Sequence, residues 1–210
     1  MKMILASPFI ITISRQLGSG GSYIGQQLAK TLNIFYADRE IIHQAAKKFS
    51  LLESDLELHE EKISSFWQNI AQSYALGVPD AYIMPQYITT DSALFRGETE
   101  IIEHIAKEQS AVIIGRCGSY ILRNHPNHVS IFLHGDKIFR TNRIQKVYNV
   151  SEEEAGKMIV QSDRERAIYN HTFTGEEWTD ARQCDLSIDT SKIGLDKSID
   201  LIMNYFDYLL

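Results

Sequence analysis

The sequence predicts an α/β protein in which helices cover both faces of a parallel sheet. Five short apolar runs have the length and composition of buried strands, and amphipathic helical patterns lie between them. Because each helix must bury its apolar stripe on a sheet face, this alternation favours parallel strands joined by right-handed crossovers. A glycine-rich segment follows the first run, at the edge where such sheets bind ligands. The predicted strands are 9–14, 34–37, 111–115, 129–134 and 186–189.

Amphipathic stripes follow the first two predicted strands and close the chain. Each stripe has apolar residues three or four positions apart, as expected for a helix that packs one side on the sheet. The last stripe is expected to complete the core. The three stripes are Ile24, Leu28, Ala29 and Leu32; Ile41, Ile42, Ala45, Ala46 and Phe49; and Ile199, Ile202, Met203 and Phe206.

The segment 54–96 interrupts the alternation of strands and helices. It opens with the capping-box pattern of Ser54 and Glu57 and continues as an apolar helical stripe as far as Gly77. We interpret it as a helical insert over the strand ends, although a helical hairpin packed on the sheet fits the pattern equally well. A further helix, with Ile101, Ile102 and Ile105 on one side, precedes the strand at 111–115.

The segment after Phe132 is predicted to be helical and contains several arginines. A second capping box, formed by Ser151 and Glu154, marks the start of one of its helices. Arg140 and Arg143 are three residues apart on one helix face, with no acidic residue four positions away, which favours anion binding. Arg164 and Arg166 alternate with acidic residues, so a solvated, self-compensated helix face explains that pair as well as anion binding does.

Composition and charge limit the possible classes of function. A chain of 210 residues with 44% apolar residues can bury one large core, so we expect a single domain over residues 1–210. A formal net charge of −6 disfavours binding of nucleic-acid polymers over the whole surface, and any anion must be held in a local basic pocket. No secretion signal or membrane span is evident, and Cys117 and Cys184 are expected to be unpaired thiols in a cytoplasmic protein.

The glycine-rich segment RQLGSGGS is predicted to bind phosphate. A strand, a glycine-rich turn and a helix together present backbone N–H groups and the positive end of the helix dipole to an anion. Against the phosphate-loop pattern GxxxxGKS/T, Gly20 and Ser22 match, whereas Arg15 replaces the first glycine and Gly21 replaces the lysine. We therefore expect the Arg15 guanidinium to replace the missing ammonium, the alternative being that Arg15 pairs with a surface carboxylate.

A dinucleotide-binding loop is the competing interpretation of this segment. Gly18 and Gly20 match the first two glycines of GxGxxG, and Asp38 lies near the offset of a ribose-binding acid. Tyr23 occupies the place of the third glycine, where a side chain obstructs close packing of the helix. This alternative predicts an NAD(P)-binding oxidoreductase.

A series of segments resembles the cytidylate kinase-like branch of the P-loop nucleoside monophosphate kinases, in the order ITIS, GSGG, FYADREII, IIGR, IFLHGDKIFRTNR, SDRERA and DLSIDT. The resemblance extends from about Ile10 to Ile202. It implies a three-layer α/β/α fold of P-loop kinase type with a five-stranded parallel sheet. It also implies that the insert at 54–96 binds a monophosphate and that residues 140–180 form an arginine-bearing lid.

The resemblance further implies roles for particular residues. The loop from Arg15 to Ser22 would hold the ATP phosphates with Ser22 near Mg²⁺, and Arg116 matches the arginine of the family's GRD element. It assigns catalysis to Arg15, Arg116, Arg140, Arg143 and Arg164; binding of the phosphate donor to Gly18, Ser19, Gly20, Gly21, Ser22 and Tyr23; and binding of the acceptor to Asp38, Arg39, Arg116 and Arg166.

Three departures from true cytidylate kinases are evident: Gly21 occupies the lysine position, Cys117 replaces the aspartate of GRD, and the insert is expected to be wholly helical. The resemblance implies an ATP-dependent phosphotransferase that moves the γ-phosphoryl group of Mg-ATP to CMP, dCMP or a related phosphorylated acceptor. The missing lysine leaves a second possibility, a nucleotide-binding protein with little or no kinase activity. Small-molecule nucleotides are the expected partners in both cases.

Overall fold

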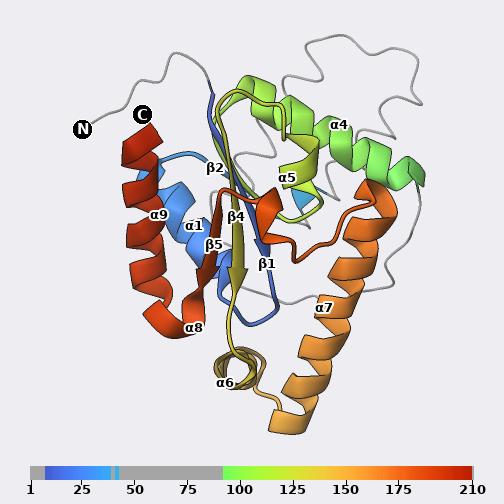
Figure 1. Cartoon of the computed structure of the whole chain (residues 1–210), viewed down its shortest axis with the longest axis vertical. Helices are drawn as coiled ribbons and strands as arrows, with labels where there is room; N and C mark the ends of the chain where they lie inside the picture. The colour runs from blue at the N-terminus through green and yellow to red at the C-terminus, as the bar shows by residue number, and fades with distance from the viewer. Residues whose placement is uncertain (1–7, 39–40, 43–91, 210) are drawn as a thin grey trace.

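A computed structural model describes residues 8–38, 41–42 and 92–209. Its centre is a five-stranded, wholly parallel sheet in the order β2-β3-β1-β4-β5 (Figure 1). The predicted α/β fold with five parallel strands is confirmed. The strands are β1 (Ile10–Arg15), β2 (Phe35–Ala37), β3 (Ala111–Ile114), β4 (His128–His134) and β5 (Leu186–Asp189).

Helices connect the strands and lie on both sides of the sheet (Figure 1). The three shortest helices were not predicted, because three or four residues are too few to show a hydrophobic period. The helices are α1 (Gly21–Leu32), α4 (Ser92–Glu108), α5 (Gly118–Ile121), α6 (Lys137–Tyr148), α7 (Glu152–Thr174), the 3-10 helix Ala181–Gln183, α8 (Thr190–Ile193) and α9 (Leu195–Leu209).

Alternating residues of the central strands supply two separate cores. On one face, Ile10 of β1 and Ile113 of β3 pack against the buried stripe of α4. On the other face, Ile11 and Ile114 pack against α1 and α9. Both faces of the sheet are therefore apolar, as are the inner sides of the helices that cover them. This fixes the strand register and the positions of the strand ends.

The carboxyl ends of β1, β3 and β4 lie at one edge of the sheet, because the strands are parallel and in register. Helices α6 and α7 lie beyond this edge (Figure 1). Leu17, in the loop after β1, is buried with Ile144 of α6 and Ala155 and Ile159 of α7. The loop after the first strand is thus packed between the sheet and these two helices.

Several local predictions are confirmed. The Ser151 hydroxyl accepts a hydrogen bond from the backbone N–H of Glu154, and the Glu154 carboxylate accepts one from the N–H of Ser151, which completes the capping box of α7. Ile202 and Phe206 of α9 are buried in the core. Residues 54–91 of the predicted insert lie outside the described residues, and its last residues, 92–96, begin α4.

The strand order contradicts a dinucleotide-binding fold. In that fold β2 lies directly beside β1, so that its acidic end reaches the loop after β1. Here β3 separates the two strands. Asp38 follows β2 at the far side of β3, and one of its oxygens accepts the N–H of Ile41 at 3.1 Å. The oxidoreductase alternative is therefore wrong.

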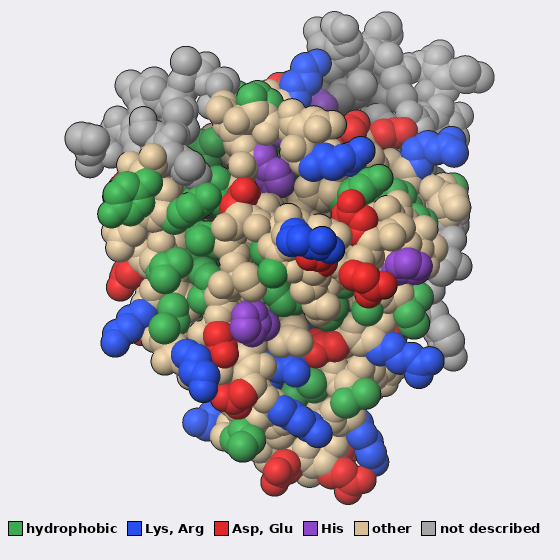
Figure 2. Space-filling view, in the orientation of Figure 1, with side chains coloured by type: hydrophobic (Ala, Val, Ile, Leu, Met, Phe, Trp, Pro, Cys, Tyr) green, Lys and Arg blue, Asp and Glu red, His purple; other side chains and the backbone are tan. Residues whose placement is uncertain are grey.

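The outer surface carries charges of both signs. Figure 2 shows lysine and arginine side chains interspersed with aspartate and glutamate over the viewed face. Among the described residues, every helix is too short or too polar to cross a bilayer.

Candidate active site

The loop after β1 has the backbone shape of an anion-binding turn. It spans residues 16–20, and Gly18 and Gly20 have φ angles of +85° and +87°, in the left-handed region that glycine adopts readily. Gly20 is the N-cap of α1, where no side chain accepts a hydrogen bond from the first turn. The N–H groups of that turn are therefore placed to bind an anion.

Arg15 and Gly21 are sterically linked. A Cβ atom at Gly21 would lie 2.6 Å from Cγ of Arg15, and a Cβ atom at Gly115 would collide with its Nη1 atom. The Arg15 side chain therefore runs across the start of α1 toward the end of β3. It occupies the space in which a lysine at position 21 would begin, which explains why arginine at 15 occurs together with glycine at 21.

The turn after β3 is strained. Gly115, Arg116 and Cys117 have consecutive φ angles of +73°, +54° and +53°, and the last two residues carry side chains. Left-handed backbone costs a non-glycine residue about 1 kcal/mol, so surrounding contacts must hold this turn in place. Such strain is concentrated at functional sites, and this turn directs Arg116 to the same edge of the sheet as Arg15.

A small cavity of about 90 Å³ lies between these two turns and α7. Three guanidinium groups from separate segments line it: Arg15 from β1, Arg116 from the turn after β3, and Arg166 from α7. The volume is several times the ~10–15 Å³ that a single water molecule requires, so the cavity has room for a compact anion. The other lining residues are Ser14, Gly115, Cys117, Glu165, Tyr169, Asn170 and Trp178.

Arg116 is held by groups from two helices. Its Nη2 atom lies 3.0 Å from Oε1 of Glu98 on α4, and its guanidinium lies over the ring of Tyr169 on α7, 5.0 Å from the centroid. Its Nε atom is buried and has no hydrogen-bond acceptor among the described residues. An unpaired buried donor is costly, so this turn keeps a polar group that packing alone does not favour.

The thiol at position 117 adds no charge to this cavity. Burial raises the pKa of Cys117 to about 12, which keeps the thiol neutral at physiological pH. An aspartate at this position would have placed a negative charge beside Arg116. The replacement therefore leaves the cavity more favourable for an anion.

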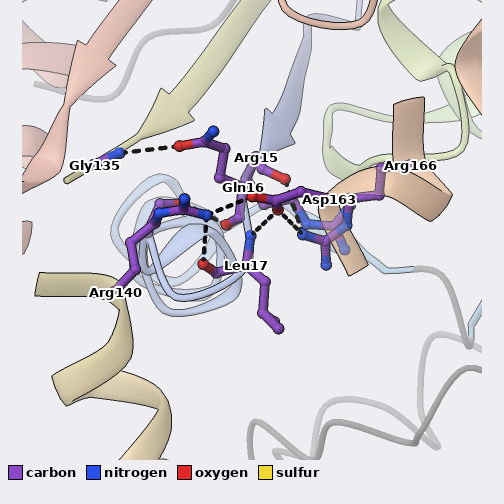
Figure 3. A network of polar contacts seen from close by, with 8 residues as sticks. Arg15, Gln16, Leu17, Gly135, Arg140, Asp163 and Arg166 are labelled. Atoms are coloured by element: carbon purple, nitrogen blue, oxygen red, sulfur yellow. Dashed lines mark hydrogen bonds and ion pairs between the residues drawn. The ribbon is translucent and has the colours of Figure 1, made fainter. Parts of the chain in front are cut away.

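A second polar network ties the loop to α6 and α7 (Figure 3). Asp163 of α7 accepts the N–H of Leu17 at 2.9 Å and the Nη1 donor of Arg140 at 2.5 Å. The same Arg140 atom donates to the carbonyl of Leu17 at 3.3 Å, and Arg166 donates to the carbonyl of Arg15 at 3.1 Å. Together these bonds fasten α7 to both sides of the loop.

The structure brings only some of the predicted site residues together at the cavity. Arg140 contacts the loop from outside it, and the Nε atoms of Arg140 and Arg143 on α6 are buried without an acceptor among the described residues. Arg164 lines a separate open hollow between α6 and α7, together with Lys137 and Glu153.

The remaining predicted residues are placed as follows. Ser19 is buried, and its hydroxyl donates to the carbonyl of Gln16 at 2.8 Å, so it stabilises the loop. Ser22 is the second residue of α1 and is partly exposed. The Tyr23 hydroxyl faces solvent and donates to Asp196 at 3.5 Å. Arg39 lies outside the described residues.

Sequence reasoning missed three residues of the site: Glu98, Asp163 and Tyr169. Glu98 lies three positions before Ile101 and four before Ile102, so a carboxylate in the buried stripe of α4 was a detectable signal. Asp163 was interpreted only as a partner of arginines on its own helix. The position of Tyr169 depends on the packing of α7 against α4, which the sequence does not encode in a short motif.

Comparison with known proteins shows the family of this chain. The family model of the cytidylate kinase-like family matches residues 10–192. The chain belongs to the cytidylate kinase-like family. It is therefore a kinase-like protein, and the predicted resemblance is confirmed.

Solved structures share its fold. An uncharacterised protein from Eubacterium ventriosum is 27% identical, with a TM-score of 0.71 over 95% of this chain and 99% of the other. Shikimate kinase from Bacteroides thetaiotaomicron is 12% identical, with a TM-score of 0.50 over 95% of this chain and 98% of the other. The second likeness supports the fold alone. No curated protein is similar enough to the sequence to match it.

Proposed function

We propose that this protein transfers the γ-phosphoryl group of Mg-ATP to CMP, dCMP or a related phosphorylated acceptor. The observation that supports this most is the convergence of Arg15, Arg116 and Arg166 on one cavity beside the glycine-rich loop. Phosphoryl transfer requires mainly that phosphate oxygens be positioned and their charge stabilised. Arginines suit this task because each presents a planar fork of donors to phosphate.

The donor phosphates would bind to the loop between β1 and α1. The N–H groups of the first turn of α1 would face an anion bound at this point, and the left-handed Gly18 and Gly20 would allow the turn to curve around it. Ser22 would hold Mg²⁺, as the hydroxyl residue of a phosphate loop does. The charge of Mg²⁺ held there would offset part of the phosphate charge.

The arginines would divide the remaining work. Arg15 would neutralise the donor phosphates in place of the lysine, and Arg116 and Arg166 would bind the acceptor phosphate, with Asp38 and Arg39 supporting the acceptor side. Arg140 would hold the loop in its binding shape through Leu17 and Asp163. We retain Arg143 and Arg164 as lid residues that would exclude water when α6 and α7 close on the nucleotide.

The proposal is tested by incubating the purified protein with Mg-ATP and a panel of nucleoside monophosphates. The expected result is ADP formation that depends on CMP or dCMP. Measurable ATP affinity without any diphosphate product would instead identify a binding protein without kinase activity. Absence of both would overturn the proposed function.

The steric link between Arg15 and Gly21 provides a sharper test. Arg15→Ala should reduce turnover about 100-fold or more, the range for loss of one preorganised electrostatic donor. Gly21→Lys alone should also be inactive, because its side chain overlaps Arg15. The double variant Arg15→Gly, Gly21→Lys recreates the full GxxxxGKS pattern and should recover activity relative to both single variants.

A matched control for these variants is Arg123→Ala. Arg123 is exposed and stacks on its neighbour Tyr120, 4.0 Å from the ring centroid. We expect it to keep the activity of the unaltered protein. Full activity in Arg15→Ala would dismiss Arg15 as the replacement for the lysine while leaving the kinase assignment intact.

A further inference from the structure

The buried carboxylate of Glu98 connects two segments that line the cavity. Glu98 is only 1% exposed, although it belongs to α4 and does not itself line the cavity. Its Oε1 atom lies 3.0 Å from Nη2 of Arg116, and its Oε2 atom accepts a hydrogen bond of 2.8 Å from the hydroxyl of Tyr169 on α7. One carboxylate therefore contacts both the turn after β3 and the helix that carries Arg166.

Packing and stability do not account for a carboxylate at this position. The neighbouring members of the buried stripe are Ile101, Ile102 and Ile105, and an apolar residue would fit the same pattern. A buried ion pair often contributes less stability than apolar residues of similar volume, because both charges must leave water. The arrangement is better explained by what it does to Arg116.

The Oε1 atom of Glu98 and the ring of Tyr169 hold Arg116 from two directions. The carboxylate forms an ion pair with Nη2 of the guanidinium, and the Tyr169 ring covers one of its faces. The Nε donor is left without an acceptor among the described residues. Burial raises the pKa of Tyr169 above its usual range, so its hydroxyl keeps the proton that it donates to Glu98.

Aromatic contacts join the same two helices. Phe95 of α4 stacks on Phe173 of α7 with centroids 4.1 Å apart, and Phe173 meets the edge of Tyr169 at 4.8 Å. The Tyr169 hydroxyl is therefore held against Glu98 only while α7 packs on α4. A displacement of α7 would remove both the ring over Arg116 and the hydrogen bond from Tyr169 to Glu98.

We propose that Glu98 is a positioning residue that orients Arg116 toward the acceptor phosphate, and that Tyr169 links this orientation to the docking of α7. The proposal rests on the proposed phosphotransferase function and adds a coupling between the helix that carries Arg166 and the acceptor side. It predicts that loss of either partner weakens acceptor binding more than ATP binding.

The test uses Glu98→Gln and Tyr169→Phe in the full chain. Removing the charge that is paired with a buried guanidinium is costly, so Glu98→Gln should raise the acceptor KM about 10-fold or more. The ATP KM should change by less than about 2-fold. Tyr169→Phe keeps the ring and should give a smaller rise in the acceptor KM. The double variant should resemble Glu98→Gln, because both changes act on one unit.

Glu100→Gln is the matched control, since Glu100 is an exposed residue two positions along α4. A second measurement follows the ¹⁵N NMR signal of the Arg116 Nε–H group, identified by its loss in Arg116→Lys. We expect this signal to exchange slowly with water in the unaltered protein and in Glu100→Gln, and rapidly in Glu98→Gln. Inorganic phosphate should shift it in the unaltered protein.

The outcomes separate the two proposals. A protein with no turnover that still shows the phosphate shift and its loss in Glu98→Gln would reject the phosphotransferase and keep the positioning role. Equal changes in both KM values, or unchanged exchange in Glu98→Gln, would overturn the positioning role. If Glu98→Gln does not fold, an unchanged acceptor KM in Tyr169→Phe would overturn the link to α7.

Discussion

Arg116 and Arg140 form two similar ion pairs with different surroundings. Each side chain is 10% exposed and pairs with a carboxylate on a helix, and each has a buried Nε atom without an acceptor among the described residues. Arg116 extends from a strained turn into the wall of the cavity. Arg140 lies within α6 and donates to the carbonyl of Leu17 in the loop. Burial and pairing alone therefore do not distinguish a ligand-binding arginine from one that holds a loop; the cavity does.

The largest expected effect is the loss of activity in Arg116→Lys. Lysine keeps a positive charge opposite Glu98 but lacks the planar fork that binds phosphate. We expect kcat/KM to fall about 10²–10³-fold, or roughly 3–4 kcal/mol, as for loss of one preorganised donor. The free energy of unfolding, measured in urea, should change by less than ~1 kcal/mol, because the ion pair is kept. If the free energy of unfolding fell by as much as the transition-state stabilisation, Arg116 would mainly hold the structure together, as Arg140 does.

The second effect is a loss of stability in Arg140→Ala. Removing one partner of a buried pair typically costs 3–5 kcal/mol, and we expect about 3 kcal/mol because Asp163 is partly exposed. Urea unfolding measures this change. If stability is kept and turnover is lost, Arg140 contacts the nucleotide directly, as the sequence alone suggests.

A buried histidine, and not either ion pair, is expected to govern the pH dependence of stability in acid. Burial lowers the pKa of His128 to about 4, and its Nε2 atom lies 2.7 Å from the Thr12 hydroxyl. In the unfolded chain a histidine titrates near 6.5, so between pH 6.5 and 4 the unfolded chain binds the extra proton and stability falls as the pH falls. We expect a loss of about 2 kcal/mol between pH 7 and pH 5.

His128→Gln should flatten this dependence, whereas His171→Gln, at an exposed position, should leave it unchanged. Arg140→Ala should lower stability at both pH values and keep the slope. A slope that survives in His128→Gln would point to another titrating group, with His104, whose pKa is also lowered by burial, as the first candidate.

The smallest expected effect concerns the start of α7, the helix that supplies partners to both arginine pairs. Ser151→Ala removes the capping hydroxyl and should cost ~1 kcal/mol in unfolding free energy. The first turn of α7, which would fray, is closer in sequence to Asp163 than to Tyr169. The acceptor KM should therefore stay unchanged, and a rise would show that the Arg116 pair depends on the whole helix.

The fold was largely predictable because burial on both faces gives each strand a continuous apolar run. Runs such as Ala111–Ile114 carry that signal without any knowledge of their neighbours. The order of the strands was not derivable from these runs and was not predicted. The helix α5 was not predicted, because its four residues are too few to show a hydrophobic period.

The site was predictable where a residue follows directly from a strand end or a glycine-rich turn. Arg15, Gly18, Gly20 and Arg116 satisfy this condition, and the structure places them at one edge of the sheet. Glu98 and Tyr169 contact each other across 71 positions of sequence. Such contacts depend on how helices pack, which local patterns do not specify.

The overlap between Arg15 and any side chain at position 21 makes these two positions one evolutionary unit. A relative that regains a lysine at 21 must also replace the arginine with a small residue, and a single change in either direction passes through an impaired intermediate. Aligned homologues should therefore fall into two groups, arginine with glycine or glycine with lysine. A motif search that inspects position 21 alone overlooks the first group entirely.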